Sequence, residues 1–456
     1  MRIRPRLRAV LSGLLFLLLI ACILVAILQK KIAPADLALI NGDIHTLDPA
    51  LPAARALVVR GSRIAAVCLT DAEAKDQVGR RTELIDLGRA FVLPGLIDGH
   101  VHFDKAGALI NDANLMAVFD EEGLRQEIRR VVALIGPGEW ITEGLWGAYE
   151  RRTSGEEGGG GGELKPAWRP HRRMIDDLTP GHPCFLCRFD NIEWLANGAA
   201  LREAGLETQP VEGMELDSDG KPTGIIFQPS PAFDRMRAAQ KPKSHQRLLA
   251  ENRAALKMLR ESGIVEIHDI AAPDQVERFV ELEEKGELTC RVWLEPGLSR
   301  GLEPAGQGFA PGLHPKTKQP SRMLRYGPLE GDIDGIMGAR GALLSFGSDW
   351  PGTSGWLCRV HPKYLIYAAV TGRSPNGEPL PAWFPERRLS VEEAIRAYTL
   401  NNALAVFEGQ VRGSLQPGKL ADITVFDRNL LKIPPQDILR AEVLDTIVDG
   451  KVVFRK

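Results

Sequence analysis

One stretch constrains the fold more than any other: the apolar run Phe91–Phe103, which contains His100 and His102 near its end. Side chains two positions apart on a β-strand point to the same side, so both imidazoles would aim at one spot where the strand ends. This arrangement predicts a pair of metal ligands. The alternative is a pair of partly solvated histidines in a turn after a buried strand. The apolar run and the Pro94-Gly95 turn before the histidines favour the metal.

The length and charge of the chain limit the kinds of partner it can have. Its 456 residues suffice for one large core and a smaller second one, because single cores stop growing at roughly 250–300 residues. A formal net charge of −2, with no sustained basic stripe in the folded part, argues against a nucleic-acid partner. We therefore expect no nucleic-acid partner. The sequence leaves the oligomeric state open.

The first thirty-one residues differ from the rest of the chain. Arginines at alternate positions from 2 to 8 precede the uncharged run Ala9–Leu28, and two lysines follow it. Such a run can cross a bilayer core of about 30 Å as a helix, and the excess of charge before it keeps the N-terminus in the cytoplasm. We therefore expect residues 1–31 to be a single-pass membrane anchor, with the remainder of the chain periplasmic or extracellular. A cleaved signal would need a small-x-small site, and a lipidated Cys22 would need polar chain after it.

Both ends of the folded part contain short apolar segments broken by glycine turns. Residues 36–90 show this pattern around Asn41-Gly42 and Gly61-Ser62, and residues 405–456 show it around Asp449-Gly450, which are hairpin signals. We expect the two ends to form one sheet module with residues 91–404 inserted between them.

Within residues 91–404, apolar runs alternate with helical stretches, which is typical of βα units. Two expected helices, Gln246–Ser262 and Asp274–Lys285, stop at Gly263 and Gly286, where a glycine commonly ends a helix. Strands are expected after the first run at Trp140–Leu145, Cys184–Phe189, Ile264–Asp269, Thr289–Leu294 and Ala342–Ser348.

Asp349 follows the last of these expected strands, in Gly347-Ser-Asp-Trp-Pro351. Barrel enzymes keep their catalytic groups at the carboxyl ends of strands, so the position suits a site residue. Ser-Asp-x-Pro is also ordinary turn chemistry, which is the alternative. The histidine pair favours the site.

Aromatic and cysteine residues in the same region have less specific meanings. Four tryptophans would cap the mouth of a barrel and could line an apolar pocket, although core packing explains them equally well. A C-x-x-C pair lies on an expected strand, where an odd separation sends the two thiols to opposite faces, so core cysteines are expected. The residues are Trp140, Trp146, Trp168 and Trp194, and Cys184 and Cys187.

At this point the chain resembles the metal-dependent amidohydrolase superfamily, and within it amidohydrolase family 3. Three motifs carry the resemblance: Val92–His102, Gly347–Pro351, and the tail Gly413–Asp422 followed by Thr446–Val452. It implies an α/β fold with a distorted TIM-type barrel, complete or incomplete, plus a small β-sandwich made from both chain ends, here preceded by the N-terminal transmembrane helix. The implied chemistry is hydrolysis of carbon–nitrogen bonds other than peptide bonds, by water activated on zinc or a similar divalent metal.

The resemblance also implies roles for individual residues. His100 and His102 match the metal ligands of the first strand, and Asp349 matches the aspartate of the last, which would serve as ligand and as general base and acid. His268 shares a strand face with Glu266 and is a further candidate ligand. A satisfied core histidine is the alternative for it.

The chain departs from the family pattern in its middle. The family's carboxylated lysine and further histidines are not found on expected strands, and Asp190-Asn-Ile192 stands where an Asp-x-His is expected. The irregular span Gly297–Gly341 is too short for two more βα units at roughly 30 residues each. The span therefore indicates an internal deletion before the Gly347–Pro351 motif. A catalytically impaired pseudo-enzyme or a membrane-tethered binding protein is the alternative function.

Overall fold

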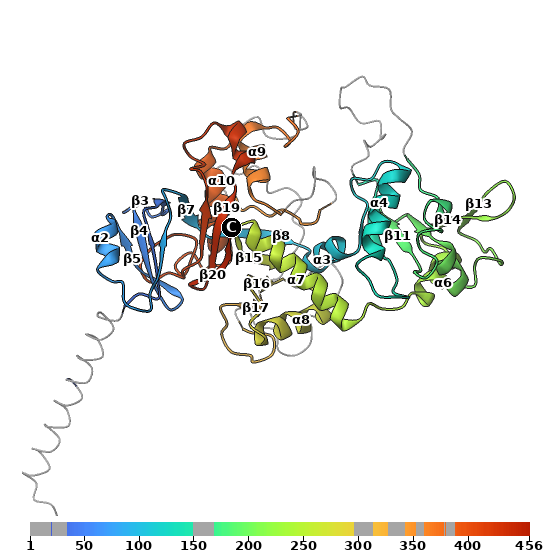
Figure 1. Ribbon diagram of the computed structural model, residues 1–456, viewed down its shortest axis with the longest axis horizontal. Helices are drawn as coiled ribbons and strands as arrows, with labels where there is room; N and C mark the ends of the chain where they lie inside the picture. Colours follow the sequence, from blue (N-terminus) through green and yellow to red (C-terminus); the bar gives the residue numbers. More distant parts are fainter. Residues whose placement is uncertain are drawn as a thin grey trace, which may run out of the picture.

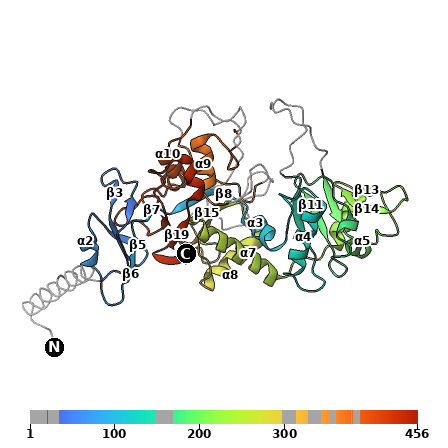
Figure 2. The ribbon, with the colours of Figure 1, turned by 45° about the horizontal axis from the view of Figure 1, so that its top comes forward.

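The structure is a computed structural model that describes Ile20 and residues 34–148, 168–295, 313–326, 343–352, 360–377, 379 and 388–456. Residues 37–86 lie at one end of the long axis, and the described residues 113–148 and 168–239 lie at the other, with the remaining described elements between them (Figure 1). The rotated view shows the same succession (Figure 2).

Two sheets at the first end pack against each other. Leu39 and Leu57 of one sheet share a buried apolar cluster with Ile423 and Ile447 of the other. The first sheet has the order β5-β4-β1-β6, with β1 (Leu37–Ile40), β4 (Ala56–Arg60), β5 (Arg63–Cys68) and β6 (Glu83–Asp86). The second has the order β20-β19-β18-β7-β2-β3, with β2 (Asp43–His45), β3 (Ala53–Ala54), β7 (Phe91–Pro94), β18 (Ile423–Phe426), β19 (Val443–Val448) and β20 (Lys451–Arg455). Both ends of the described chain therefore supply strands to the second sheet.

The turns of these sheets test the hairpin predictions. The hairpins at Gly61-Ser62 and Asp449-Gly450 are confirmed, because β4 pairs with β5 and β19 pairs with β20 across them, both antiparallel. The hairpin at Asn41-Gly42 is wrong. There β1 pairs with β4 and β6, whereas β2 pairs with β3 and β7, so the chain crosses from one sheet to the other at this turn.

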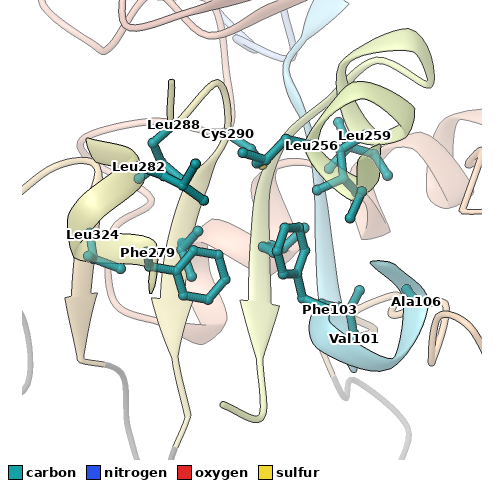
Figure 3. Close-up of a cluster of buried hydrophobic side chains, with 14 of the residues drawn as sticks. Val101, Phe103, Ala106, Leu256, Leu259, Phe279, Leu282, Leu288, Cys290 and Leu324 are labelled. Carbon is teal, nitrogen blue, oxygen red and sulfur yellow. The ribbon is translucent and has the colours of Figure 1, made fainter. Parts of the chain in front are cut away.

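The central sheet is parallel and has the order β17-β16-β15-β8. Helices α7 and α8 cover one of its faces, and their Leu256, Leu259, Phe279 and Leu282 pack in one apolar cluster with strand residues (Figure 3). Both helices end close to their predicted glycines. The bounds are β8 (Leu96–Val101), β15 (Ile264–Asp269), β16 (Arg291–Leu294), β17 (Leu324–Tyr326), α3 (Phe103–Asn111), α7 (His245–Glu261) and α8 (Pro273–Glu284).

A fourth, mixed sheet occupies the far end and has the order β13-β14-β12-β11-β10-β9. The strands β9, β10 and β11 run parallel, and the others pair antiparallel. Its elements are β9 (Ala113–Asn114), α4 (Glu121–Val132), β10 (Glu143–Trp146), η1 (Arg172–Met174), β11 (Phe185–Arg188), β12 (Glu193–Ala196), α5 (Gly198–Glu203), β13 (Met214–Leu216), β14 (Pro222–Phe227) and α6 (Pro231–Ala239). The predicted strands near 140 and 184 thus exist, but they lie in a different sheet from β15.

The expected α/β fold is present, but the complete form of the expected TIM-type barrel is not supported. Among the described strands none links the two ends of the central sheet, so no closed barrel is formed. Strands β9 to β14 form their own sheet, which antiparallel strands complete, instead of continuing the parallel one. The described part of the predicted strand Ala342–Ser348 has no regular secondary structure.

The C-terminal helices lie beside the six-stranded sheet that contains β18. Helix α10 (Val391–Ala397) begins with the capping box of Ser390 and Glu393. Ile395 of this helix and Ile366 of α9 (Lys363–Thr371) pack on Phe91 and Phe426. The remaining elements are α2 (Asp71–Lys75), α11 (Leu400–Ala405) and η2 (Pro435–Arg440). The domain boundaries expected from the sequence stay a prediction.

The predicted membrane anchor is also corrected. Residues 1–31, on which it rested, lie outside the described residues apart from Ile20. In the described part of the chain, no helix combines the length and the apolar character needed to cross a bilayer. The structure therefore gives no support to a single-pass membrane protein with an extracytoplasmic catalytic part, and that localisation is withdrawn.

Candidate metal centre

The structure brings His100, His102 and Asp349 together. His100 lies on β8, and His102 directly precedes α3 as its N-cap residue. Asp349 lies about 250 positions later, in a segment that runs beside β8, with Val101 and Trp350 forming a parallel bridge. Each histidine Nε2 atom is 3.2 Å from Asp349 Oδ1. Among the described residues, this trio is the set of potential metal ligands whose ligand atoms all lie within 4.8 Å of one another.

These separations suit a metal ion. Zinc–ligand bonds of about 2.0–2.1 Å in a tetrahedron put neighbouring ligand atoms about 3.3 Å apart. The 3.2 Å between each imidazole nitrogen and Asp349 Oδ1 is close to that value. Two neutral nitrogens and one carboxylate oxygen are also a donor set that zinc and similar divalent cations accept. The residues present therefore fit a divalent cation.

The site is open to solvent. The side chains of His100, His102 and Asp349 are 32%, 43% and 50% exposed. The hydrogen bonds from His100 and His102 hold the pKa of the Asp349 carboxyl well below its usual range, so this carboxylate is charged near neutrality. Three protein ligands and an accessible face are the arrangement that catalytic metal sites use to leave one position for water or substrate.

Two buried carboxyl groups accept hydrogen bonds from the backbone next to the three residues. Asp98 Oδ1 accepts the backbone N–H of Ser348 at 2.8 Å, and its Oδ2 lacks a hydrogen-bond partner. Asp269 Oδ1 accepts the N–H of Phe103 at 2.8 Å, which satisfies the first turn of α3 in place of a side-chain cap from His102. Burial raises the pKa of Asp98 to about 6 and that of Asp269 to about 7.

His268 lies apart from the trio. It is 3% exposed on β15, and its Nε2 is 3.2 Å from Glu266 Oε1 while its Nδ1 is 3.7 Å from Glu295 Oε1. Burial lowers the pKa of His268 to about 4, so the ring is neutral near pH 7. Both ring nitrogens therefore face carboxylates, which matches the alternative of a core histidine better than that of a fourth ligand.

The tryptophans and cysteines lie in or against the apolar clusters of the far sheet. Trp140 and Trp146 are 3% and 1% exposed and belong to different clusters, and the partly buried Trp194 and Trp168 pack against these two clusters. Cys184 and Cys187 are buried free thiols in separate clusters, as expected for opposite faces of β11.

The sequence analysis missed Asp98 and Asn402, which both contact the backbone beside the trio. A charged residue inside the apolar run Leu96–Val101 was a signal for the first, whereas nothing distinguished Asn402 from an ordinary helix residue.

Comparison with known proteins agrees with this geometry. The model of the amidohydrolase family matches residues 83–340 and 335–454, which is most of the chain. The chain belongs to the amidohydrolase family. The resemblance predicted from the three motifs is thereby confirmed, and membership supports a hydrolase.

Two curated relatives match this chain over most of its length at low identity. The protein LONG AFTER FAR-RED 3 of Arabidopsis thaliana is 24% identical, over 92% of this chain and 92% of its own length. The N-substituted formamide deformylase of Arthrobacter pascens is 21% identical, over 92% of this chain and 98% of its own. A structure of an uncharacterised metal-dependent hydrolase from Pyrococcus horikoshii shares the fold, with a TM-score of 0.58 and 18% identity over 88% of this chain and 99% of that one.

Proposed function

We propose that this amidohydrolase is a metal-dependent hydrolase of small molecules that cleaves carbon–nitrogen bonds other than peptide bonds, of the amide, N-formyl or N-acyl type. The observation that carries the proposal is the convergence of His100, His102 and Asp349 at separations suited to a divalent cation, with zinc as the first candidate. The formamide deformylase relative adds N-formyl compounds to the substrates worth testing.

Each of the three residues would have a defined role in hydrolysis. A divalent cation, when bound, supplies Lewis acidity and lowers the pKa of water at the site towards neutrality. His100 and His102 would hold the cation through Nε2, and Asp349 would hold it through Oδ1. The second carboxylate oxygen of Asp349, Oδ2, would take a proton from the attacking water and pass it to the leaving nitrogen.

A binding protein without turnover is the second candidate. The central sheet is open among the described strands, and the alignments with two relatives span 564 and 553 positions although the chain has 456 residues. Those relatives thus contain residues that this chain lacks. We infer that the missing residues belong before the Gly347–Pro351 motif, where the family's middle strands would stand. Such a protein would bind metal and small molecules at His100 and His102 without hydrolysing them.

Elemental analysis of the purified protein tests the metal site. We expect about one equivalent of divalent metal in the wild type and a large loss in His102→Ala. His245→Ala is the matched control, because His245 Nε2 also faces a carboxylate, Glu281, at 2.6 Å, but without a second histidine in the pair. Equal, near-zero metal in all three proteins would contradict the proposal.

Hydrolysis assays then separate the two candidates. A panel of N-substituted formamides and N-acyl amino acids should be hydrolysed, with activity lost on chelation and restored by added zinc. Metal binding without any turnover on the panel would favour the binding protein.

A further inference from the structure

The segment that carries Asp349 has no regular secondary structure to hold it in place. Residues 343–349 form neither helix nor strand. Backbone hydrogen bonds to β8 support it instead: Gly99 N–H donates to Phe346 O at 2.9 Å, Asp349 N–H to His100 O at 2.9 Å, and His102 N–H to Trp350 O at 2.7 Å. Asp349 also has a left-handed backbone, with φ of 54°, which is uncommon outside glycine. We call this set of backbone hydrogen bonds between β8 and residues 346–350 the seam. The position of the Asp349 carboxylate therefore depends on how firmly the seam is held.

Asn402 of α11 bonds to both sides of the seam. Its Nδ2 donates to Ile97 O on β8 at 2.6 Å and to Phe346 O at 2.9 Å. The residue is 1% exposed, so water does not replace these bonds when they are lost. One amide group thus fixes the spacing between the strand of the histidines and the segment of Asp349.

Asp98 and two glycines hold the same seam from within. Asp98 Oδ1 accepts Ser348 N–H at 2.8 Å and His100 N–H at 3.4 Å. A Cβ atom on Gly99 would lie 2.7 Å from Asn402 Oδ1, and one on Gly347 would lie 2.6 Å from His100 Cβ. The close approach of the two backbones therefore requires glycine at both positions.

We propose that Asn402 and Asp98 are positioning residues, which hold the segment 346–350 against β8 so that Asp349 meets His100 and His102. This inference rests on the proposed metal site. Neither residue is one of the three proposed ligands; both act through the backbone that carries these ligands. Groups that orient ligands in this way typically change metal affinity 10–100-fold when removed.

The test compares Asn402→Ala with the wild type, using Co²⁺ as the probe. Visible absorption of bound Co²⁺ reports both affinity and coordination geometry, and amide exchange by mass spectrometry reports on peptides 96–102 and 343–350 without any metal. We expect Asn402→Ala to bind Co²⁺ at least tenfold more weakly, with altered absorption bands and faster exchange in both peptides. Asp98→Asn keeps an acceptor oxygen for Ser348, so it should retain more of the exchange protection than Asp98→Ala.

Asn197→Ala is the matched control. Asn197 is 0% exposed, and its Nδ2 donates to Thr179 and His182 in the loop before β11, so this variant loses similar bonds away from the site, together with the side-chain cap of α5. It should leave Co²⁺ binding and both peptides unchanged. An Asn402→Ala protein with wild-type affinity, or with unchanged exchange in the two peptides, would overturn the positioning role.

Two outcomes keep the inference separate from the proposed function. If the wild type binds no Co²⁺, the metal site fails, but faster exchange in Asn402→Ala still supports the positioning role and unchanged exchange overturns it. If Asn402→Ala does not fold, exchange in the wild type decides. Slow exchange at Ser348 and Asp349, whose N–H groups bond to Asp98 and His100, supports the seam, and fast exchange there overturns it.

Discussion

Removing Asp422 should destabilise the protein strongly, because this carboxylate neutralises a fully buried guanidinium. Arg291 on β16 is 0% exposed, and its Nε and Nη2 atoms are each 2.9 Å from Asp422 oxygens. Nη2 is also 2.9 Å from Asp449 Oδ1, in the turn between β19 and β20. Asp422 Oδ1 accepts the N–H of Asp449 as well, so Asp422 connects the central sheet to the sheet that contains β18, β19 and β20.

The magnitude follows from what Asp422→Ala leaves behind. Breaking a buried ion pair by removing one partner typically costs 3–5 kcal/mol, because the other charge stays buried without compensation. Asp449 still faces Arg291 in the variant, so we expect the lower end, about 3 kcal/mol. In Asp422→Ala combined with Arg291→Met, the stranded charge is gone and part of the loss should return.

Urea unfolding at pH 7, followed by circular dichroism, measures these differences. Glu287→Ala is the matched control, because Glu287 pairs with Arg253 at 2.7 Å with side chains 39% and 41% exposed. An exposed pair of this kind contributes about 0–1 kcal/mol. A loss in Asp422→Ala no larger than in Glu287→Ala would refute the reasoning, and so would a double variant less stable than the single one.

Three further predictions concern charge, backbone and metal. Burial raises the pKa of Asp269 to about 7, so the contribution of this carboxyl group to stability is present below its unfolded pKa near 4 and is lost as the pH rises through 7. Between pH 5 and 8, the metal-free wild type should therefore lose about 2–3 kcal/mol of unfolding free energy relative to Asp269→Asn. Urea midpoints that change in parallel in the two proteins would contradict this. Gly263→Ala should lower the melting temperature clearly more than Gly286→Ala. Both glycines have positive φ, but only a Cβ on Gly263 would meet another side chain, that of Thr424 at 2.5 Å. Equal losses in the two variants would count against this packing argument. Zinc at a hundredfold excess over Kd should stabilise the wild type by about 2.7 kcal/mol and leave His102→Ala unchanged, so an equal shift of the melting temperature in both would show that the zinc binds elsewhere.

The sequence predicted best those elements whose signal is local. The strand Ile264–Asp269 is observed with those bounds, and α7 and α8 begin and end within one or two residues of their predicted limits. Apolar spacing and terminal glycines decide such elements, and both are visible in a short window. His100 and His102 could be selected for the same reason, since a strand places them on one side.

Pairing between distant segments could not be predicted in this way. The Asn41-Gly42 turn has hairpin residues, yet β1 is buried in the middle of one sheet and β2 continues in another. The segment before Asp349 has the apolar character of a strand but bonds to β8 without strand geometry. The bonds of Asn402 to Ile97 and Phe346 depend on the tertiary fold, so no nearby residue announces them.

The continuity of β7 and β8 has a consequence for the order in which the protein can fold. Only Gly95 separates the strand that pairs with β18 from the strand that carries His100, and Leu96 N–H bonds to Thr424, 328 positions along the chain. The seam with Asp349 and the bonds of Asn402 close over 250 and 305 positions. During synthesis, the apolar run Phe91–Phe103 therefore cannot form these contacts until almost the whole chain has been made. Contacts of such long sequence separation form slowly, and an exposed apolar strand is prone to aggregate meanwhile. We expect shortened chains that end before α11 to accumulate in insoluble form, with the two histidines present and no site around them.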